Sequence, residues 1–217
     1  MSEKAIHHKF ILLGSSRGLG WEVYQQLLIK YPQSQFLLIS RKIFQKSEKI
    51  NKTNTELLAF DFSQQNVNID LLNSLQQFQP THILYIAGGG PYGVFESKKW
   101  SDHVWAMNVN YNSPAQILHF ILSHPKLFPD LVTVLFVGSK IAEDQPDPMA
   151  SSYCAAKHAL KGLITTLQKE NSSSIQIKLF SPGYIDTALL PEKSWPREMN
   201  LAKSAEIVAS DLINILN

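Results

Sequence analysis

Gly14-Ser15-Ser16-Arg17-Gly18-Leu19-Gly20 follows directly on an apolar run at residues 10–13 and opens a segment whose apolar residues recur every fourth position. This stretch decides the fold, because the short run predicts a buried strand and the recurrence predicts an amphipathic helix. Glycines between a strand and a helix let the backbone approach a pyrophosphate, whose charge the helix N-terminus stabilises. The sequence therefore favours a dinucleotide-binding loop over a plain strand–helix turn. The loop residues expected at the dinucleotide are Gly14, Ser16, Arg17, Gly18, Leu19 and Gly20.

The same loop also contains the pattern G-x-S-x-G, in Gly14, Ser16 and Gly18, which is the nucleophile elbow of α/β-hydrolases. A hydrolase needs earlier strands to carry its oxyanion-hole loop, and it needs a histidine late in the chain. Here the loop follows the first predicted strand, and His158 is the last histidine. The hydrolase interpretation is therefore disfavoured.

Five more apolar runs follow along the chain, and amphipathic stretches separate them. The six runs lie at residues 10–13, 36–39, 57–60, 83–86, 131–137 and 175–180. Their near-continuous hydrophobicity suits parallel strands that are covered on both faces. We therefore expect an α/β fold, namely a Rossmann-like doubly wound parallel sheet of about six strands with helices on both faces.

Composition and charge exclude several other classes of protein. The 217 residues are 44% apolar and 18% charged, which is typical of a globular protein. The 20 basic and 18 acidic residues form no basic stripe, so no nucleic-acid partner is expected. Cys154 is the single cysteine and the seven histidines lack metal-ligand spacing, so we expect neither a disulfide framework nor a metal site. No apolar run reaches the roughly 18 residues of a membrane span, and the N-terminal residues lack a signal-peptide pattern, so a cytoplasmic protein is expected.

The residues after the second apolar run favour NADP(H) over NAD. An NAD site usually places a carboxylate there, about 20 residues beyond the glycine loop, to accept hydrogen bonds from the ribose. This chain has Ser40-Arg41-Lys42 instead, and no acidic residue between positions 22 and 48. An arginine grips a 2′-phosphate with two parallel hydrogen bonds, a role that Arg41 can fill with help from Arg17. The competing interpretation is that Arg41 and Lys42 are solvated surface charges.

A tyrosine and a lysine are placed for proton transfer at the start of the predicted helix at residues 153–170. The four-residue spacing of Tyr153 and Lys157 puts both side chains on one helix face. A nearby ammonium is expected to lower the pKa of the Tyr153 phenol, which suits a general acid. Ser139 follows the fifth run, and Thr187 follows the sixth, so both are expected at the same edge of the sheet.

Taken in order along the chain, these motifs resemble those of the classical short-chain dehydrogenase/reductase family over residues 9–217. The resemblance implies that Tyr153 is the proton donor and acceptor, that Lys157 binds the nicotinamide ribose and tunes Tyr153, and that Ser139 orients the carbonyl. It also implies an asparagine that anchors a water in the proton relay. The family's V-N-L-x-G pattern matches residues 109–113, which makes Asn110 the better choice, with Asn108 as the alternative.

The cofactor site is expected to extend over the ends of the later strands. Asp61, which ends the third strand region, is placed to accept a hydrogen bond from the adenine amino group. The further residues expected at the cofactor are Ser40, Arg41, Asp61, Phe62, Ala87, Gly88, Tyr153, Lys157, Pro182, Gly183, Ile185 and Thr187.

These expectations combine into one function. We expect an NADP(H)-dependent oxidoreductase that reduces an aldehyde or ketone to an alcohol, or the reverse, with Tyr153 as general acid and base. Its partner is then a small carbonyl or alcohol substrate. The alternative is a non-catalytic NADP(H)-binding sensor or scaffold of the same fold. Residues 1–217 are expected to form a single NADP-binding Rossmann-fold domain with an integral catalytic site.

Two segments of the chain depart from the family pattern inside the expected site. Tyr85-Ile86-Ala87-Gly88 stands where the family has N-N-A-G, so asparagine bracing of the fourth strand is expected to be lost. The serine and the tyrosine of the catalytic set are one residue further apart than usual, which implies a longer loop between them. The acidic residues of that loop, Glu143, Asp144 and Asp147, are interpreted as solvated.

The C-terminal part of the chain also departs from the family. The segment after Thr187, which usually folds over the substrate, is short, and the usual seventh strand is missing. We therefore expect a homodimer through helices 4 and 5 of the family, which carry the asparagine and the tyrosine, or else a monomer. Tyr92, Phe95 and Trp195 are candidate walls of the substrate pocket, with plain packing as the alternative.

Overall fold

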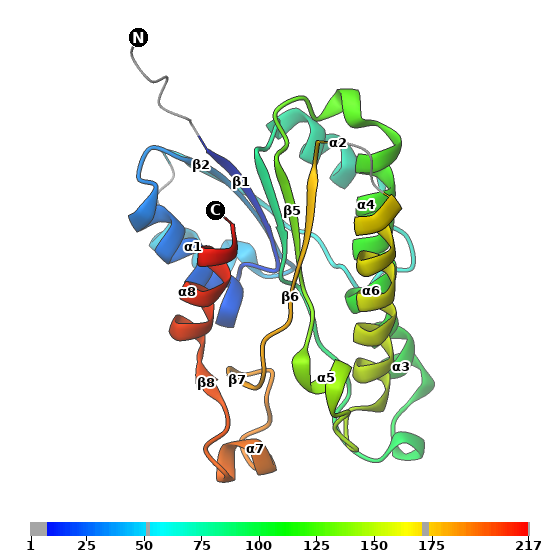
Figure 1. The fold of residues 1–217 in the computed structure, drawn as a ribbon. Helices are drawn as coiled ribbons and strands as arrows, with labels where there is room; N and C mark the ends of the chain where they lie inside the picture. The colour runs from blue at the N-terminus through cyan, green and yellow to red at the C-terminus, as the bar shows by residue number, and fades with distance from the viewer. Residues whose placement is uncertain (1–7, 51–52, 171–173, 217) are drawn as a thin grey trace.

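Six parallel strands form one sheet in the computed structural model, which describes residues 8–50, 53–170 and 174–216 (Figure 1). The strands are β1 (Lys9–Leu13), β2 (Gln35–Ile39), β3 (Thr55–Leu58), β4 (His82–Tyr85), β5 (Thr133–Val137) and β6 (Gln176–Phe180). Their spatial order is β3-β2-β1-β4-β5-β6, so the winding reverses between β1 and β4. The predicted Rossmann-like doubly wound sheet is confirmed, although β3 begins two residues before the predicted run at 57–60.

Helices cover both faces of this sheet (Figure 1). The helices are α1 (Gly18–Lys30), α2 (Ile69–Phe78), α3 (Trp100–Met107), α4 (Ser113–Ser123), α5 (Lys140–Asp144), α6 (Ser151–Glu170), α7 (Trp195–Glu198) and α8 (Ala205–Ile215). The short helical segments are η1 (Ile43–Lys49), η2 (Phe95–Ser97), the π-helical η3 (Asn108–Asn112) and η4 (Pro125–Leu127). α1 and α8 pack together on one face, while α2, α4 and α6 cover the other.

The strands are buried from both sides. In β1, Ile11 and Leu13 pack in the layer beneath α2, α4 and α6, while Phe10 and Leu12 pack in the layer beneath α1 and α8. None of these four side chains is more than 1% exposed. Burial on both faces explains why the strands appear in the sequence as continuous apolar runs.

A small second sheet lies beyond the carboxyl end of β6. In it β7 (Ile185–Asp186) pairs in parallel with β8 (Lys203–Ser204), and α7 lies between them in the sequence. Within residues 174–216, no strand after β6 joins the main sheet. None of the helices in the described parts of the chain is long and apolar enough to cross a lipid bilayer.

Candidate active site

A cleft of about 550 Å³ opens at the carboxyl ends of the strands. Its wall is formed by the glycine loop after β1, the residues that follow β2 to β6, and the first turns of α6. Ligands of open α/β sheets bind at this edge, where the strand order reverses. Every residue that the sequence predicts for the cofactor lines this cleft. Of the predicted catalytic residues, Ser139, Tyr153 and Lys157 line it too, whereas Asn110 is fully buried and lies outside the lining.

The glycine loop has the shape that a dinucleotide needs. Gly14 adopts a φ of +101°, and a Cβ there would collide with the backbone of Ala87 after β4. A Cβ at Gly20 would collide with the carbonyl group of Gly14. The residue before α1, Arg17, makes no side-chain cap, so the first-turn amides of the helix are available to a phosphate. These features fit a pyrophosphate at the N-terminus of α1.

Ser40, predicted at the cofactor, supports the glycine loop in the structure. Its Oγ accepts hydrogen bonds from the amides of Ser15 at 2.7 Å and Ser16 at 3.1 Å, and donates one to the carbonyl oxygen of Ile39 at 2.7 Å. The hydroxyl lines the cleft, but these three contacts hold it in place. The hydroxyl therefore fixes the glycine loop, and its contact with the cofactor stays a prediction.

Positive charge gathers at the end of the cleft near β2. Arg17, Arg41, Lys42 and Lys46 all line this end, and no acidic side chain except Asp61 lines the cleft. Asp61 forms an ion pair with Arg41 at 3.7 Å. The sequence does not predict Lys46 at the cofactor site, because its position depends on the fold of η1. In the structure its Nζ lies 4.9 Å from the centre of the Trp21 ring. Its spacing from Arg41 in the sequence gives no signal of this.

α6 brings Tyr153 and Lys157 to the cleft. Both continue the helix face of Leu160 and Ile164, which are fully buried against the sheet. Lys157 is only 2% exposed, and its Nζ donates a hydrogen bond to the carbonyl oxygen of Val137 at 2.7 Å. The ammonium lies 5.7 Å from the centre of the Tyr153 ring. The structure thus brings the predicted pair together at the end of β5.

Burial dominates the protonation of this pair. It raises the pKa of the Tyr153 phenol to about 12, while the Ser139 hydroxyl acts to lower it. Burial lowers the pKa of the Lys157 ammonium to about 8, against the charge of Glu143, which raises it. The expectation that Lys157 lowers the pKa of Tyr153 is wrong for this structure. Desolvation of the phenolate prevails, and the ammonium is bound to a backbone carbonyl.

The two candidate asparagines face different parts of the molecule. Asn110 lies in the π-helical η3, and its Nδ2 donates to the carbonyl oxygens of Gly89 and Ala106. Asn110 and Lys157 approach the same side of Gly88. A Cβ at Gly88 would lie 3.1 Å from Asn110 Oδ1 and 3.6 Å from Lys157 Nζ. Asn108 instead donates to the carbonyl oxygen of Ser63 at 2.9 Å. The geometry favours Asn110 for a relay to Lys157, which stays a prediction.

A tyrosine braces the fourth strand where the family pattern has asparagine. Tyr85 is 1% exposed, and its hydroxyl donates a hydrogen bond to the carbonyl oxygen of Val109 at 2.8 Å. This bond joins β4 to η3. The asparagine is absent, but the attachment of the strand to the helix behind it is retained.

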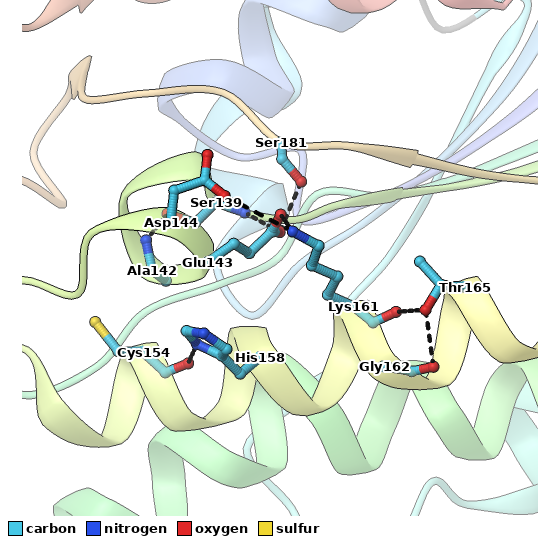
Figure 2. A network of polar contacts seen from close by, with 10 residues as sticks. All are labelled: Ser139, Ala142, Glu143, Asp144, Cys154, His158, Lys161, Gly162, Thr165 and Ser181. Carbon is cyan, nitrogen blue, oxygen red and sulfur yellow. Dashed lines mark hydrogen bonds and ion pairs between the residues drawn. The ribbon is translucent and has the colours of Figure 1, made fainter.

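The acidic loop after β5 is largely buried, which corrects the interpretation of its residues as solvated. The Glu143 side chain is 4% exposed, and the whole Asp147 residue is 6% exposed. Asp147 accepts hydrogen bonds from the amide of Met149 at 3.0 Å and the hydroxyl of Tyr184 at 3.1 Å. Only Asp144, at 53% side-chain exposure, fits the expectation. Figure 2 shows Glu143 directed into the protein toward Ser181. Ser181 and Tyr184, in the segment after β6, contact Glu143 and Asp147, and nothing in the local sequence indicates these contacts.

The outer wall of the cleft is apolar and differs from the predicted set. It is formed by Trp105, Ile141, Tyr184, Ala188, Leu189 and Leu190. The predicted aromatics Tyr92, Phe95 and Trp195 are not part of the lining. The ring centres of Phe95 and His103 lie 4.3 Å apart. Trp195 packs edge-on against Tyr184, with 5.5 Å between the ring centres. Packing, the alternative interpretation, describes these two.

Metal-ligating side chains do not converge in this region. Across residues 8–50, 53–170 and 174–216, no group of three or more His, Cys, Asp or Glu side chains is arranged to hold a metal ion.

Comparisons with known proteins place the chain among related sequences and folds. A family model described as short chain dehydrogenase matches residues 9–197. The chain is 24% identical over 229 residues to hydroxysteroid 11-beta-dehydrogenase 1-like protein B of Xenopus laevis, covering 98% of this chain and 76% of the relative. It is similar in fold to 4-hydroxyisoleucine dehydrogenase complexed with NADH, with a TM-score of 0.83, 17% identity, and coverage of 97% and 91% of the two chains. BdcA in complex with NADPH gives a TM-score of 0.78, 18% identity, and coverage of 95% and 85%.

Proposed function

The chain belongs to the short-chain dehydrogenase family, and we propose that it acts there as an NADP(H)-dependent oxidoreductase on an aldehyde or ketone, or on the corresponding alcohol. One observation carries the proposal. Ser139, Tyr153 and Lys157 share a single cleft with the glycine loop, so a proton donor lies in the same space as a dinucleotide-binding turn. All of this lies on one sheet with its helices, which supports a single domain with an integral catalytic site.

The proposed chemistry divides between cofactor and protein. NADPH supplies the hydride, and the side chains hold the carbonyl and provide the proton. Ser139 binds the carbonyl oxygen, and the Tyr153 hydroxyl donates its proton to that oxygen. Lys157 would bind the nicotinamide ribose, and Asn110 would hold a water of the relay that returns a proton to Tyr153.

Tyr153 carries its proton at neutral pH, because burial raises the pKa of the phenol to about 12. The protonated phenol is the form that reduction of a carbonyl consumes. Oxidation of an alcohol would need the phenolate, which burial of the side chain disfavours.

The preference for NADP(H) rests on the charges near β2. Arg17, Arg41, Lys42 and Lys46 all line the cleft, and arginine and lysine side chains can donate hydrogen bonds to a 2′-phosphate. An NAD site would instead present a carboxylate at the end of β2. Among the proteins similar in fold, one is complexed with NADPH and another with NADH, so this preference depends on the residues of this chain.

The apolar outer wall indicates the kind of carbonyl compound. Trp105, Leu189 and Leu190 offer an apolar surface, and the cationic lining side chains other than Lys157 belong to the β2 end of the cleft. A neutral aldehyde or ketone with an apolar substituent fits this surface better than a carboxylated one.

A panel of neutral and carboxylated aldehydes and ketones tests the proposal. The wild type should consume NADPH with members of the neutral group and form the matching alcohol, as measured by absorbance at the nicotinamide band and by product analysis. NADPH binding without turnover of any compound would favour the sensor instead. One observation speaks for that alternative, namely that Tyr85 and Ile86 stand where the family pattern has two asparagines.

Self-association is a separate part of the proposal. We keep the homodimer through the helices of Asn110 and Tyr153, because α3 next to them exposes Trp100 by 72% and Val104 by 41%. Light scattering should show a dimer for the wild type and a monomer for Trp100→Glu. A monomeric wild type would remove the dimer from the account.

A further inference from the structure

Glu143 is a buried carboxylate next to the proposed catalytic set. It lies on the short helix α5, which begins directly after Ser139 (Figure 2). Its side chain is 4% exposed. A buried carboxylate is costly unless it is paired and hydrogen-bonded. Its partners therefore show what the fold uses it for.

One oxygen of Glu143 joins the ends of two strands. Oε1 accepts a hydrogen bond from the amide of Ser139 at 3.1 Å, just after β5, and another from the Ser181 hydroxyl at 2.7 Å, just after β6. Gly138 leaves room for this bridge, since a Cβ there would lie 2.5 Å from the same oxygen. The bridge holds Ser139 against the segment that continues into Pro182 and Gly183 on the cleft wall.

The second oxygen faces a half-exposed lysine. Oε2 pairs with Lys161 Nζ at 3.3 Å, and this ammonium also lies 3.8 Å from Asp144 (Figure 2). Lys161 is 41% exposed, so solvent screens its attraction for Glu143. The charge of Glu143 is therefore not fully compensated from this side.

The remaining charge acts on Lys157. Tyr153, on the same helix, places its ring 5.7 Å from the ammonium, and Val137 on β5 offers only a carbonyl oxygen. Asn110, beyond Gly88, is neutral. Among the described residues, Glu143 is the acidic group whose charge acts on Lys157, and it raises the pKa that burial lowers.

We propose that Glu143 is a positioning residue of this site, which holds the Ser139 backbone against the end of β6 and supplies the negative charge that acts on Lys157. The proposal rests on the proposed function for the roles of Ser139 and Lys157. Neither contact of Glu143 reaches the substrate or the cofactor, so its influence passes through these two residues.

Glu143→Gln removes the charge and keeps an oxygen that can accept both hydrogen bonds. Asp144→Asn is the matched control, because it makes the same neutralisation one residue away on the exposed side of α5. The titration of Lys157 is followed by NMR of protein labelled at the lysine Cε carbons, with Lys157→Met identifying its signal. The activity is followed as kcat for carbonyl reduction between pH 6 and 9.

We expect the Lys157 midpoint to fall by about one pH unit in Glu143→Gln and to stay in place in Asp144→Asn. At pH values well above the Lys157 midpoint of the wild type, kcat of Glu143→Gln should be about tenfold lower than that of the wild type. The reason is that the charged fraction of Lys157 there changes tenfold per pH unit. Near pH 6 the two activities should converge. A purely structural defect would lower kcat at every pH. An unchanged Lys157 midpoint, or an equal shift in both variants, would overturn the proposal.

Ser181→Ala tests the bridge alone and covers the case in which Glu143→Gln does not fold. It removes one donor to Oε1 and leaves the charge in place. We expect kcat to fall about threefold to tenfold with KM and the Lys157 midpoint unchanged, since the position of Ser139 loosens. Unchanged kcat would overturn the positioning role. A wild type without NADPH binding or turnover would defeat the proposed function, while the Lys157 titration would still report on Glu143.

Discussion

The two halves of the cleft are built in different ways. The half beneath the glycine loop is shaped by backbone, with Gly14 pressed against Ala87 and Gly20 against Gly14. The half between α5, α6 and β7 is shaped by single side chains from distant segments, such as Glu143 bridging Ser139 and Ser181. The first half should therefore respond to changes in backbone space, and the second to the loss of single atoms or charges.

The largest effect is expected from removing one oxygen in the side-chain half. Tyr153→Phe deletes the proposed proton donor, and kcat for carbonyl reduction with NADPH should fall about 10²- to 10⁴-fold, which is the usual contribution of general acid catalysis. NADPH affinity should change little. Tyr184→Phe is the matched control on the same cleft wall, and it should lose less than about tenfold. Equal turnover by wild type and Tyr153→Phe would show that another group supplies the proton.

Gly14→Ala probes the backbone half. At a φ of +101° and with Ala87 in the way, an added Cβ must displace the loop. We expect the free energy of unfolding to drop by about 1–3 kcal/mol and NADPH binding to be lost, as measured by urea unfolding and by titration. Gly162→Ala in α6, outside the cleft lining, is the control, because nothing lies within 4 Å of a Cβ there. If both variants behave alike, backbone space does not define this half.

The pH dependence of stability reports on Lys157. Its pKa is lowered from 10.5 to about 8 by burial, so between these values the unfolded chain binds a proton that the folded protein does not. The free energy of unfolding should therefore rise with pH through this window. From pH 7.5 to 9.5 we expect the wild type to gain about 2 kcal/mol relative to Lys157→Met, measured by urea unfolding at both pH values. Parallel curves for the two proteins would mean that Lys157 titrates as an ordinary lysine.

The smallest effect is expected at the charged end near β2. Arg41→Ala should weaken NADPH binding about tenfold and leave NADH binding unchanged, since only the former has the 2′-phosphate. Lys49→Ala, at the end of η1 and outside the cleft lining, should change neither. A similar loss for both nucleotides would indicate that Arg41 supports the loop and does not recognise the phosphate.

The same contrast explains what the sequence could predict. The strands and the glycine loop depend on local patterns. The apolar runs therefore place all six strands within two residues at each end, and the predicted cofactor residues all line one cleft. Glu143, Lys46 and Asp147 depend on contacts between segments far apart in the chain, and their neighbours in the sequence carry no sign of them. The pKa of Tyr153 was predicted in the wrong direction for the same reason, because burial is a property of the folded site.

The preference for NADP(H) can be measured without a substrate, by binding of NADPH and NADH to the wild type. Trp105 lines the cleft, so quenching of tryptophan fluorescence follows the titration. We expect a Kd for NADPH at least about tenfold lower than that for NADH, which corresponds to about 1.4 kcal/mol. Equal affinities for the two nucleotides, or binding of neither, would contradict this preference.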